Sequence, residues 1–373
     1  MRIKRLLALL LALMIVALPS FALAAAVRVK AVGDIMCFTT QIGLAKTSSG
    51  YNFNRFFNDI TPVLSDADLT IGNLETPVSS TSKFAATSNP TFNAPKEFLS
   101  ALKEAGFDMV STANNHSFDC RLEGLYETLD ALDSYGIAYS GTARNRAEKE
   151  TPLIIEKEGI SFGFTAWSQH DNGNSHYAPS DIRKDVFNRL SADGVREDVV
   201  RLRNGGADIV IALVHWDKEH QNAPTAATRA MATTLFRNGV DIMLGAHSHC
   251  LQPVEMRTMT DIDGRVSRRL VAYSLGNFIS NMGGINVETA MILNLEFEKH
   301  FDYVDLTGAT YTPTTFYRGR NANGSPAHRL FALGSEQVNA DPPLSNQAAS
   351  WFRNARNHAI NIIGNDVIQL SEN

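Results

Sequence analysis

The sequence predicts an alternating α/β fold with parallel, buried strands. Predicted helices are repeatedly followed by short apolar runs, a glycine separates each such helix from its strand, and polar residues gather where strands end. Glycine just past a helix end supplies the left-handed conformation that the turn needs. Short apolar runs after such helices are typical of buried parallel strands. Together these features indicate an α/β protein.

The predicted elements follow one another in a regular order. Residues 27–32 alternate apolar and polar side chains as a strand does, and the alternation stops at Gly33-Asp34. A helix–glycine–strand unit then occurs three times, with helices at 98–105, 199–204 and 231–238 and strands at 107–111, 207–214 and 240–244. This repetition predicts that successive strands run parallel in a sheet.

The pattern changes beyond Phe278. Residues 290–297 and 303–311 are predicted strands, 319–325 a polar loop and 346–363 a helix. We interpret them as closing strands of the same domain followed by a C-terminal helix. The predicted division is a signal peptide at 1–24, one domain at 25–335 and a helical extension at 336–373 that packs on it.

The first 24 residues resemble a secretory signal peptide. Arg2, Lys4 and Arg5 precede an apolar run at 6–18, and Ala22-Leu23-Ala24 places small residues where a signal peptidase cleaves. A retained membrane anchor is the alternative, although the run is shorter than the roughly 20 residues that span a bilayer. We therefore expect cleavage after Ala24 and a secreted, periplasmic or cell-surface protein.

Composition excludes some classes of partner. The chain has 373 residues, of which 44% are hydrophobic and 20% charged, enough to bury a large core. Its net charge of −5 and pI near 6.1 argue against nucleic acid as a partner, which normally requires a basic surface.

Three cysteines, Cys37, Cys120 and Cys250, leave at least one thiol unpaired within a monomer. Each lies close in sequence to a polar motif. Thiolate ligation of a metal is possible in principle, but small buried side chains beside the site are the favoured interpretation.

Polar residues end several of the predicted strands. They are Asp34, Asn73 with Glu75, Asn114-Asn115-His116, His215, His247 with His249, and Asn277. In open α/β sheets, ligands bind beyond the carboxyl ends of the strands. The sequence therefore predicts that these side chains form a single site.

Each signal has an ordinary structural alternative. His215 could be a core histidine, Asn115-His116 a turn, and a His-x-His pair is only a modest indication of metal. A metal cluster is favoured because all these alternatives would have to apply at the same sheet edge. Carboxylate, imidazole and amide ligands suit Mn, Fe or Zn. More than four candidate ligands favour two divalent ions bridged by one carboxylate.

Six motifs occur in an order that resembles the CapA family, which is associated with poly-γ-glutamate capsules. They are Gly33-Asp34-Ile35-Met36, Gly72-Asn73-Leu74-Glu75, Ala113-Asn114-Asn115-His116 with Asp119, His215-Trp216 with Glu219, Gly245-Ala246-His247-Ser248-His249, and Tyr273-Ser274-Leu275-Gly276-Asn277-Phe278. The resemblance covers about residues 27 to 300. That family is similar to calcineurin-like metallophosphoesterases, so the resemblance implies a four-layer α/β/β/α sandwich of the metallophosphoesterase type.

The resemblance also implies roles for individual residues. Asp34 and His249 would bind the first metal, Glu75 would bridge, and the second metal would be held by Asn115, His215 and His247. His116 would be the general acid, with Asp119 orienting its imidazole. The expected substrate contacts are Asn73, Glu219, His170 and Asn277, although the segment around His170 is equally compatible with a polar surface loop.

Two positions depart from the related patterns. Metallophosphoesterases have histidine where this chain has Met36, and a thioether is a poor ligand for such ions, so the first metal site is one ligand short. CapA-like sequences share that loss. They usually have glycine where this chain has Asp217, whose carboxylate would contact either the cluster or, as we prefer, solvent.

Two functions remain open at this stage. One is a metal-dependent hydrolase of phosphoester or amide bonds in the cell envelope. The other is a non-catalytic component of a capsule synthesis or export complex that binds polymer through its metal ions. Either implies an anionic cell-envelope polymer or its precursor as partner, together with a membrane synthesis or export complex.

Overall fold

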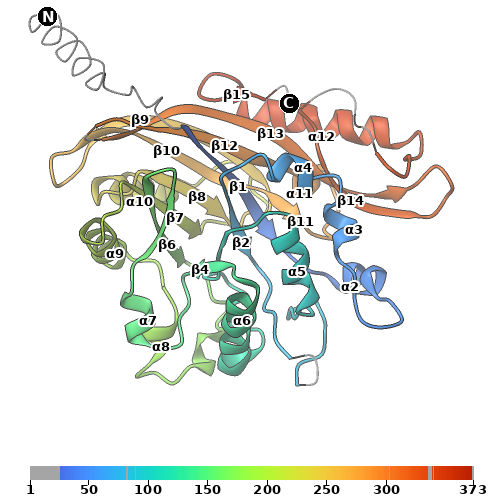
Figure 1. Cartoon of the computed structure of the whole chain (residues 1–373), viewed down its shortest axis with the longest axis horizontal. Helices are drawn as coiled ribbons and strands as arrows, with labels where there is room; N and C mark the ends of the chain where they lie inside the picture. Colours follow the sequence, from blue (N-terminus) through green and yellow to red (C-terminus); the bar gives the residue numbers. More distant parts are fainter. Residues whose placement is uncertain are drawn as a thin grey trace, which may run out of the picture.

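The computed structural model describes residues 26–80, 83–88, 90–301, 303–334, 338 and 340–371. The predicted signal peptide lies outside the described residues. Two β-sheets pack face to face, and helices cover their outer surfaces (Figure 1). The predicted four-layer α/β/β/α sandwich is therefore confirmed.

The first sheet combines a parallel half and an antiparallel half. Its strands, in spatial order, are β14 (Pro326–Ala332), β13 (Val304–Arg320), β12 (Thr289–Lys299), β1 (Ala26–Ile35), β2 (Leu69–Leu74), β3 (Met109–Ser111) and β4 (Ala138–Ser140). The short strands β11 (Asn277–Ile279) and β15 (Gln369–Leu370) pair with β1 and β13. Strands β1 to β4 run parallel, so their carboxyl ends share one edge.

The second sheet has a parallel centre and antiparallel edges. Its order is β5 (Leu153–Lys157), β6 (Ile160–Ser168), β7 (Ile209–His215), β8 (Ile242–Ala246), β10 (Val266–Leu275) and β9 (Leu251–Thr260). The four central strands are parallel, and β5 and β9 are antiparallel to their neighbours. Its parallel strands therefore also end at a common edge.

A continuous apolar core joins the two sheets. Val29 and Ile71 of the first sheet belong to the same buried cluster as Ile211 and Leu244 of the second. Alternate residues of each strand face this layer, which is the arrangement expected of packed sheets.

Helices cover the outer faces through separate apolar clusters. The first sheet is covered by α2 (Thr39–Ala45), α3 (Asn54–Phe57), α4 (Thr61–Leu64), α5 (Glu97–Glu104) and α6 (Arg121–Tyr135). The second is covered by α9 (Ala192–Asn204) and α10 (Ala226–Arg237). Short helices α7 (Arg146–Glu150), η1 (Asn174–Tyr177), α8 (Arg183–Val186) and α11 (Ile285–Glu288) lie in connections.

The C-terminal helix α12 (Ala348–Ile363) packs on β13 and β14 (Figure 1). Phe331 of β14 and Ala355 of α12 belong to one buried cluster, so the helix packs on the domain. Of the helices that the structure describes, none has the length and hydropathy needed to cross a membrane.

Most of the predicted elements are present, with shifted boundaries. The glycine turns at Gly106 and Gly239 have φ of +103° and +98°, as the helix ends required. The predicted strand 303–311 was too short, because β13 continues to Arg320. Residues beyond Tyr311 pair with both β12 and β14, and this tertiary pairing outweighs the interruption that Pro313 suggests.

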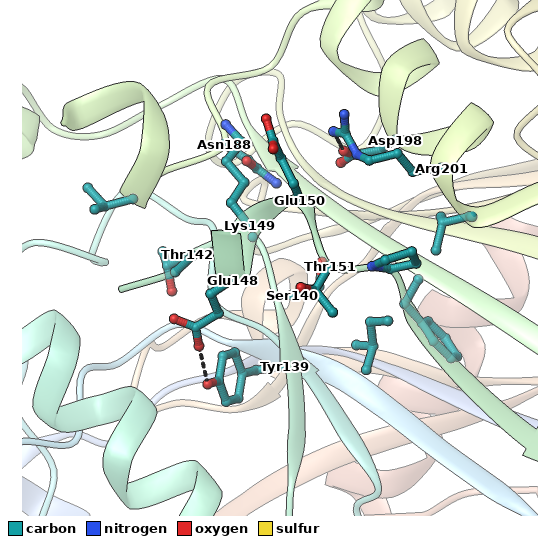
Figure 2. A pocket seen from close by; sticks show the side chains of 17 residues that line it. Tyr139, Ser140, Thr142, Glu148, Lys149, Glu150, Thr151, Asn188, Asp198 and Arg201 are labelled. Carbon is teal, nitrogen blue, oxygen red and sulfur yellow. Dashed lines mark hydrogen bonds and ion pairs between the residues drawn. The ribbon is translucent and has the colours of Figure 1, made fainter. Parts of the chain in front are cut away.

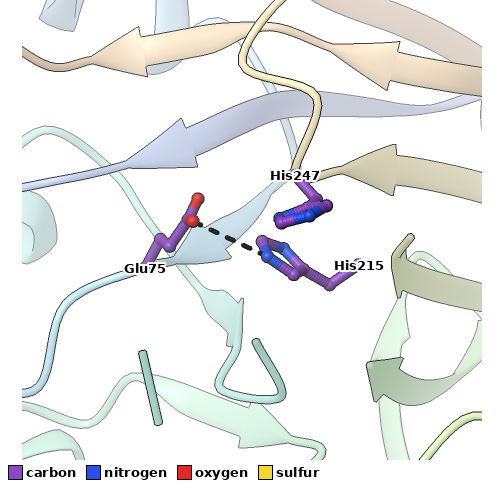
Figure 3. Close-up of side chains that lie close together, drawn as sticks. All are labelled: Glu75, His215 and His247. Carbon is purple, nitrogen blue, oxygen red and sulfur yellow. Dashed lines mark ion pairs between the residues drawn. The ribbon is translucent and has the colours of Figure 1, made fainter. Parts of the chain in front are cut away.

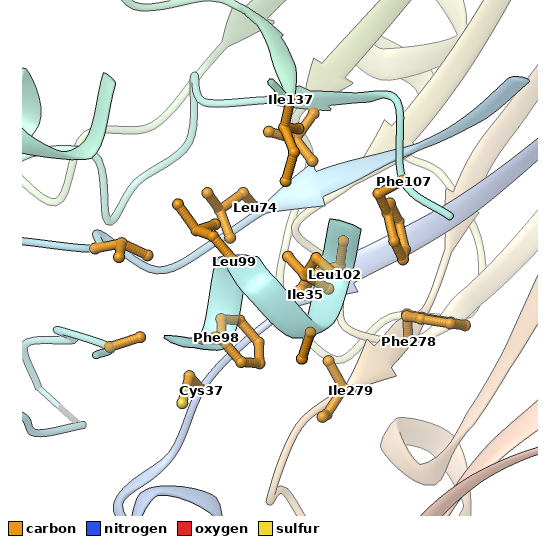
Figure 4. Close-up of a cluster of buried hydrophobic side chains, with 14 of the residues drawn as sticks. Ile35, Cys37, Leu74, Phe98, Leu99, Leu102, Phe107, Ile137, Phe278 and Ile279 are labelled. Carbon is orange, nitrogen blue, oxygen red and sulfur yellow. The ribbon is translucent and has the colours of Figure 1, made fainter. Parts of the chain in front are cut away.

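The packing under α5 predicts the cost of removing one aromatic ring. Phe98 is fully buried with Leu99 and Leu102 against the first sheet (Figure 4). Its ring centroid lies 5.3 Å from that of Phe53. Replacing Phe98 with Ala should lower the free energy of unfolding by about 3–5 kcal/mol, measured by urea titration. The half-exposed Val200→Ala on α9 is the control and should change it by less than about 1 kcal/mol. Equal effects would contradict the assigned packing.

Candidate metal centre

The predicted site residues meet at the carboxyl ends of strands from both sheets. Asp34 of β1 is in register with Asn73 of β2, and Glu75 follows directly after β2. His215 is the last residue of β7, and His247 follows directly after β8. The structure thus brings together residues far apart in sequence, as expected at such an edge.

Two groups of possible metal ligands share one carboxylate. One group consists of Glu75, His215 and His247 (Figure 3). The other consists of Asp34, Glu75 and His249. Within each group the ligand atoms lie within 4.8 Å of one another, and all the residues are buried. Glu75 therefore occupies the position that a carboxylate bridging two cations would need.

The hydrogen bonding of this cluster fits a cation. Both carboxylate oxygens of Glu75 and Nδ1 of His247 are buried without a hydrogen-bond partner in the part of the chain that the structure describes. Leaving such atoms unsatisfied costs about 1–3 kcal/mol each. Metal ligation would satisfy all three atoms, so the donor set fits a divalent ion.

The electrostatics agree with this fit. Burial, and then the neighbouring Asp34, raise the pKa of Glu75 well above its usual value. Burial lowers the pKa of His215 well below the normal range and that of His247 to about 2. Both imidazoles are therefore neutral and keep a lone pair for a metal. A buried carboxylate pair, in contrast, requires nearby positive charge to stay ionised.

Asn115 lies beside the group that contains His215 and His247. Its Oδ1 is 3.0 Å from Nε2 of His215, and its Nδ2 donates to Oδ1 of Asn172 at 3.3 Å. The contact with Asn172 keeps the amide oxygen of Asn115 directed at the cluster. Asn172 belongs to the polar segment around His170 that the sequence offered for substrate contacts, and it lies in a left-handed turn with φ of +49°.

Hydrogen bonds fix which nitrogen of His249 is available. Its Nδ1 lies 2.9 Å from Oδ1 of Asn277 and 3.2 Å from Oδ2 of Asp34, so Nδ1 carries the proton. Although burial lowers the pKa of His249, the hydrogen bond to Asp34 outweighs it and raises the pKa. Nε2 remains for a ligand and lies 3.9 Å from Oε1 of Glu75.

The His-x-His segment has an unusual backbone. His247 and His249 have φ of +92° and +58°. Such conformations cost of order 1–3 kcal/mol for residues other than glycine and are concentrated at functional sites. This kink lets two side chains separated by one residue converge on the same cluster.

Asn73 and Asn277 lie behind the ligands. Asn73 donates through Nδ2 to Asp34 at 2.9 Å and accepts through Oδ1 from Asn114. Asn277 accepts from His249 and donates to the carbonyl of Val287 at 3.1 Å. Both amides are buried, and these hydrogen bonds connect them to Asp34 and His249; their role as substrate contacts stays a prediction.

His116 and Asp119 form a pair at the edge of the cluster. Nδ1 of His116 donates to Oδ2 of Asp119 at 2.7 Å, and the same oxygen accepts from the backbone of Phe92. The ring of Phe92 meets that of His116 edge-on at 4.7 Å. These contacts fix the imidazole, and among the described residues its Nε2 has no hydrogen-bond partner.

Two further residues complete the surroundings. His170 stacks on His247 with ring centroids 4.1 Å apart, and its Nε2 donates to the carbonyl of Asp217. The sequence interpretation preferred a solvent-facing carboxylate for Asp217, but the structure does not show this. Asp217 is buried, and its Oδ2 accepts from the backbone of Thr225 at the start of α10, so the carboxylate stabilises a helix end. Glu219 is half-exposed and lies outside both ligand groups.

All three cysteines are buried and free. Burial raises the pKa of Cys120 and Cys250 to about 11 and that of Cys37 higher still. The thiols are therefore protonated near neutral pH, in agreement with their interpretation as small buried side chains.

A separate pocket of about 70 Å³ lies between the edge strands β4 and β5 (Figure 2). The charged side chains that line it pair with neighbours. Glu148 accepts from Tyr139 at 2.7 Å, Asp198 pairs with Arg201, and Glu150 pairs with an arginine outside the pocket. These lining charges are engaged in structural contacts, so the pocket is a weaker candidate for a functional site than the buried cluster.

The chain is similar to known bacterial capsule proteins. The family model described as bacterial capsule synthesis protein PGA_cap matches residues 28–282. The chain is 27% identical over 263 residues to the capsule biosynthesis protein CapA of Bacillus anthracis, covering 68% of this chain and 59% of that protein. It is 24% identical over 276 residues to the PGA biosynthesis protein CapA of Bacillus subtilis, covering 72% and 67% respectively.

A solved structure supports the fold. The calcineurin-like phosphoesterase YfkN from Bacillus subtilis superposes with a TM-score of 0.50 at 14% identity, covering 91% of this chain and 99% of that one. At this identity the likeness concerns the fold alone, and the predicted metallophosphoesterase type of sandwich is confirmed.

Proposed function

The chain belongs to the bacterial capsule synthesis protein family PGA_cap, and on that premise we propose that it is a divalent-metal-dependent hydrolase acting in capsule poly-γ-glutamate synthesis. The proposed bond is a phosphoester or an amide in an anionic cell-envelope polymer or its precursor. The names of its Bacillus relatives support the capsule assignment. The chain aligns with 59% of the B. anthracis protein, so the activity and partners are carried over only as part of this proposal.

One observation carries the hydrolase proposal. The buried carboxylate of Glu75 has two oxygens without hydrogen-bond partners among the described residues and belongs to both ligand groups. We assign the ligands as Asp34, Glu75 and His249 for one cation and Glu75, Asn115, His215 and His247 for the other. Divalent cations held there would polarise the scissile group and neutralise the charge that develops on it.

His116 is the proposed proton donor to the leaving group. Nδ1 of His116 donates a hydrogen bond to Asp119, so the doubly protonated imidazole would give its Nε2 proton to the leaving group. The hydrogen bond from the backbone of Phe92 holds Asp119 in place, and thereby fixes the direction of the imidazole. The proposal therefore gives His116 a catalytic role and Asp119 a positioning role.

Removing the metal tests the proposal on the unmodified protein. The purified chain should contain divalent metal by elemental analysis and should hydrolyse phosphoesters or γ-glutamyl polymer. Dialysis against a chelator should abolish turnover, and adding back Mn²⁺ or Zn²⁺ should restore it. Turnover that persists at full rate without metal would contradict the proposal.

Met36 favours a second candidate function. It follows the ligand strand β1 and is buried, but its thioether is a poor ligand for these ions. On this account the chain is a non-catalytic, metal-containing component of a capsule synthesis or export complex. Metal-dependent binding of γ-glutamyl polymer without hydrolysis of polymer or phosphoester would favour this second function.

Export belongs to the same proposal. The basic start, the apolar run at 6–18 and Ala22-Leu23-Ala24 support a signal peptide. An exported chain would meet the envelope polymer directly.

A further inference from the structure

The two ligand groups that share Glu75 are unequal. The group with His215 and His247 gains a fourth ligand from Oδ1 of Asn115, whereas the group with Asp34 and His249 has three among the described residues. Divalent ions with such ligands usually take at least four. The Asp34 group therefore lacks a donor relative to its neighbour.

The polar side chains next to this group do not supply the missing donor. The amides of Asn73 and Asn277 are hydrogen-bonded to Asp34 and His249, so they already act behind the ligands. The Cys250 thiol belongs to neither ligand group. A further protein donor would therefore have to be a side chain that can still turn toward the group.

His220 lies in the right place to supply it. Its backbone N–H donates to the carbonyl of Ser248 at 2.7 Å, which ties the loop after β7 to the His-x-His segment. The His220 ring lies 5.9 Å from that of His249. The imidazole pairs already within the cluster, His215 with His247 and His247 with His249, are separated by 4.6 and 6.2 Å, so His220 falls within their range.

We propose that His220 is an additional ligand of the cation held by Asp34, Glu75 and His249, with Glu219 orienting its imidazole. This inference rests on the proposed metal centre. Nε2 of His220 lies 3.8 Å from Oε2 of Glu219, which leaves Nδ1 for the cation. Metal-bound histidines commonly direct their second nitrogen to a carboxylate in this way. The His220 side chain is 55% exposed, so it can turn onto a cation without disturbing the core.

The charge distribution supports the same placement. Burial and Asp34 are the main causes of the raised pKa of Glu75, but the charge of Glu219 raises it further. Glu219 also raises the pKa of His249. The negative charge of Glu219 therefore acts on both Glu75 and His249, where it would strengthen cation binding.

Replacing His220 with glycine tests the inference on the full chain. Glycine removes the imidazole and tolerates the local φ of +59°, so the loop keeps its backbone conformation. Equilibrium dialysis against Mn²⁺ or Zn²⁺ with elemental analysis should give two tightly bound equivalents for the wild type and one for H220G. Cobalt substitution should show the same loss as a weaker visible absorption. His300→Ala, in the turn after β12, is the control and should bind like the wild type.

The outcomes separate this inference from the proposed function. Glu219→Gln should weaken binding of the same equivalent by about 10–100-fold, the effect usual for a residue that orients a ligand. If the wild type binds two equivalents and H220G binds both unchanged, the His220 assignment is wrong while the metal centre stands. A wild type that binds only one equivalent would also overturn it. If the wild type binds no metal, the proposed function itself fails.

Discussion

Glu75→Gln should remove both metal equivalents and lower metal-dependent turnover by roughly 10³-fold or more. The substitution keeps the shape of the side chain but removes the negative charge that both ligand groups share. Metal ions supply several kcal/mol of transition-state stabilisation, and each 1.36 kcal/mol corresponds to a factor of ten in rate. A change at any other proposed ligand should weaken mainly one group, so Glu75 should give the largest effect.

Elemental analysis and initial rates measure this effect, and stability without metal controls for misfolding. Since the oxygens of Glu75 have no hydrogen-bond partner among the described residues, Gln replaces no such contact in the metal-free protein. In the presence of chelator, the free energy of unfolding of E75Q should therefore stay within about 1 kcal/mol of that of the wild type. Glu197→Gln, an exposed position on α9, is the matched control. Normal metal content in E75Q would contradict the bridging assignment.

His116→Ala should retain metal and lose about 10²–10⁴-fold in turnover on a poorly activated phenyl or alkyl phosphoester. Nε2 of His116 is the nitrogen left free by the hydrogen bond to Asp119, so the variant loses the proposed proton donor. A p-nitrophenyl ester should be much less affected, because its leaving group departs without a proton. The difference between the two substrates distinguishes proton transfer from binding.

His176→Ala is the control for this experiment. Its imidazole is exposed on η1 and donates to the carbonyl of Gly173, so its loss should leave both rates near the wild-type values. Equal losses on both esters would assign His116 to binding. Retained turnover on the poorly activated ester would remove it from the acid role.

Local sequence patterns predicted the helices and strands, but they could not predict which strands belong to which of the two sheets. The strands 27–32 and 207–214 are both short and apolar, and nothing in either pattern shows that β1 and β7 belong to different sheets. The prediction of a four-layer sandwich depended on the order of the motifs and their resemblance to a family. The length of β13 was missed because it depends on pairing with β12 and β14, which are assembled only in the folded chain.

The site shows the same limit at the level of side chains. Strand ends predicted the meeting of Asp34, Glu75 and His215, since parallel strands share an edge. The supporting contacts were not predictable, because they depend on loop geometry. Asn172 and His220 lie beside the cluster in left-handed turns, and the contact between Asn277 and His249 at 2.9 Å is known only from the folded chain.

The most direct test is anomalous diffraction from crystals of the protein grown with Mn²⁺ or Zn²⁺, recorded at the absorption edge of the metal. The account predicts two peaks on either side of Glu75, each about 2.0–2.2 Å from one of its carboxylate oxygens. A map without a peak at Glu75, or with Glu75 directed into dry apolar packing, would contradict the shared metal centre.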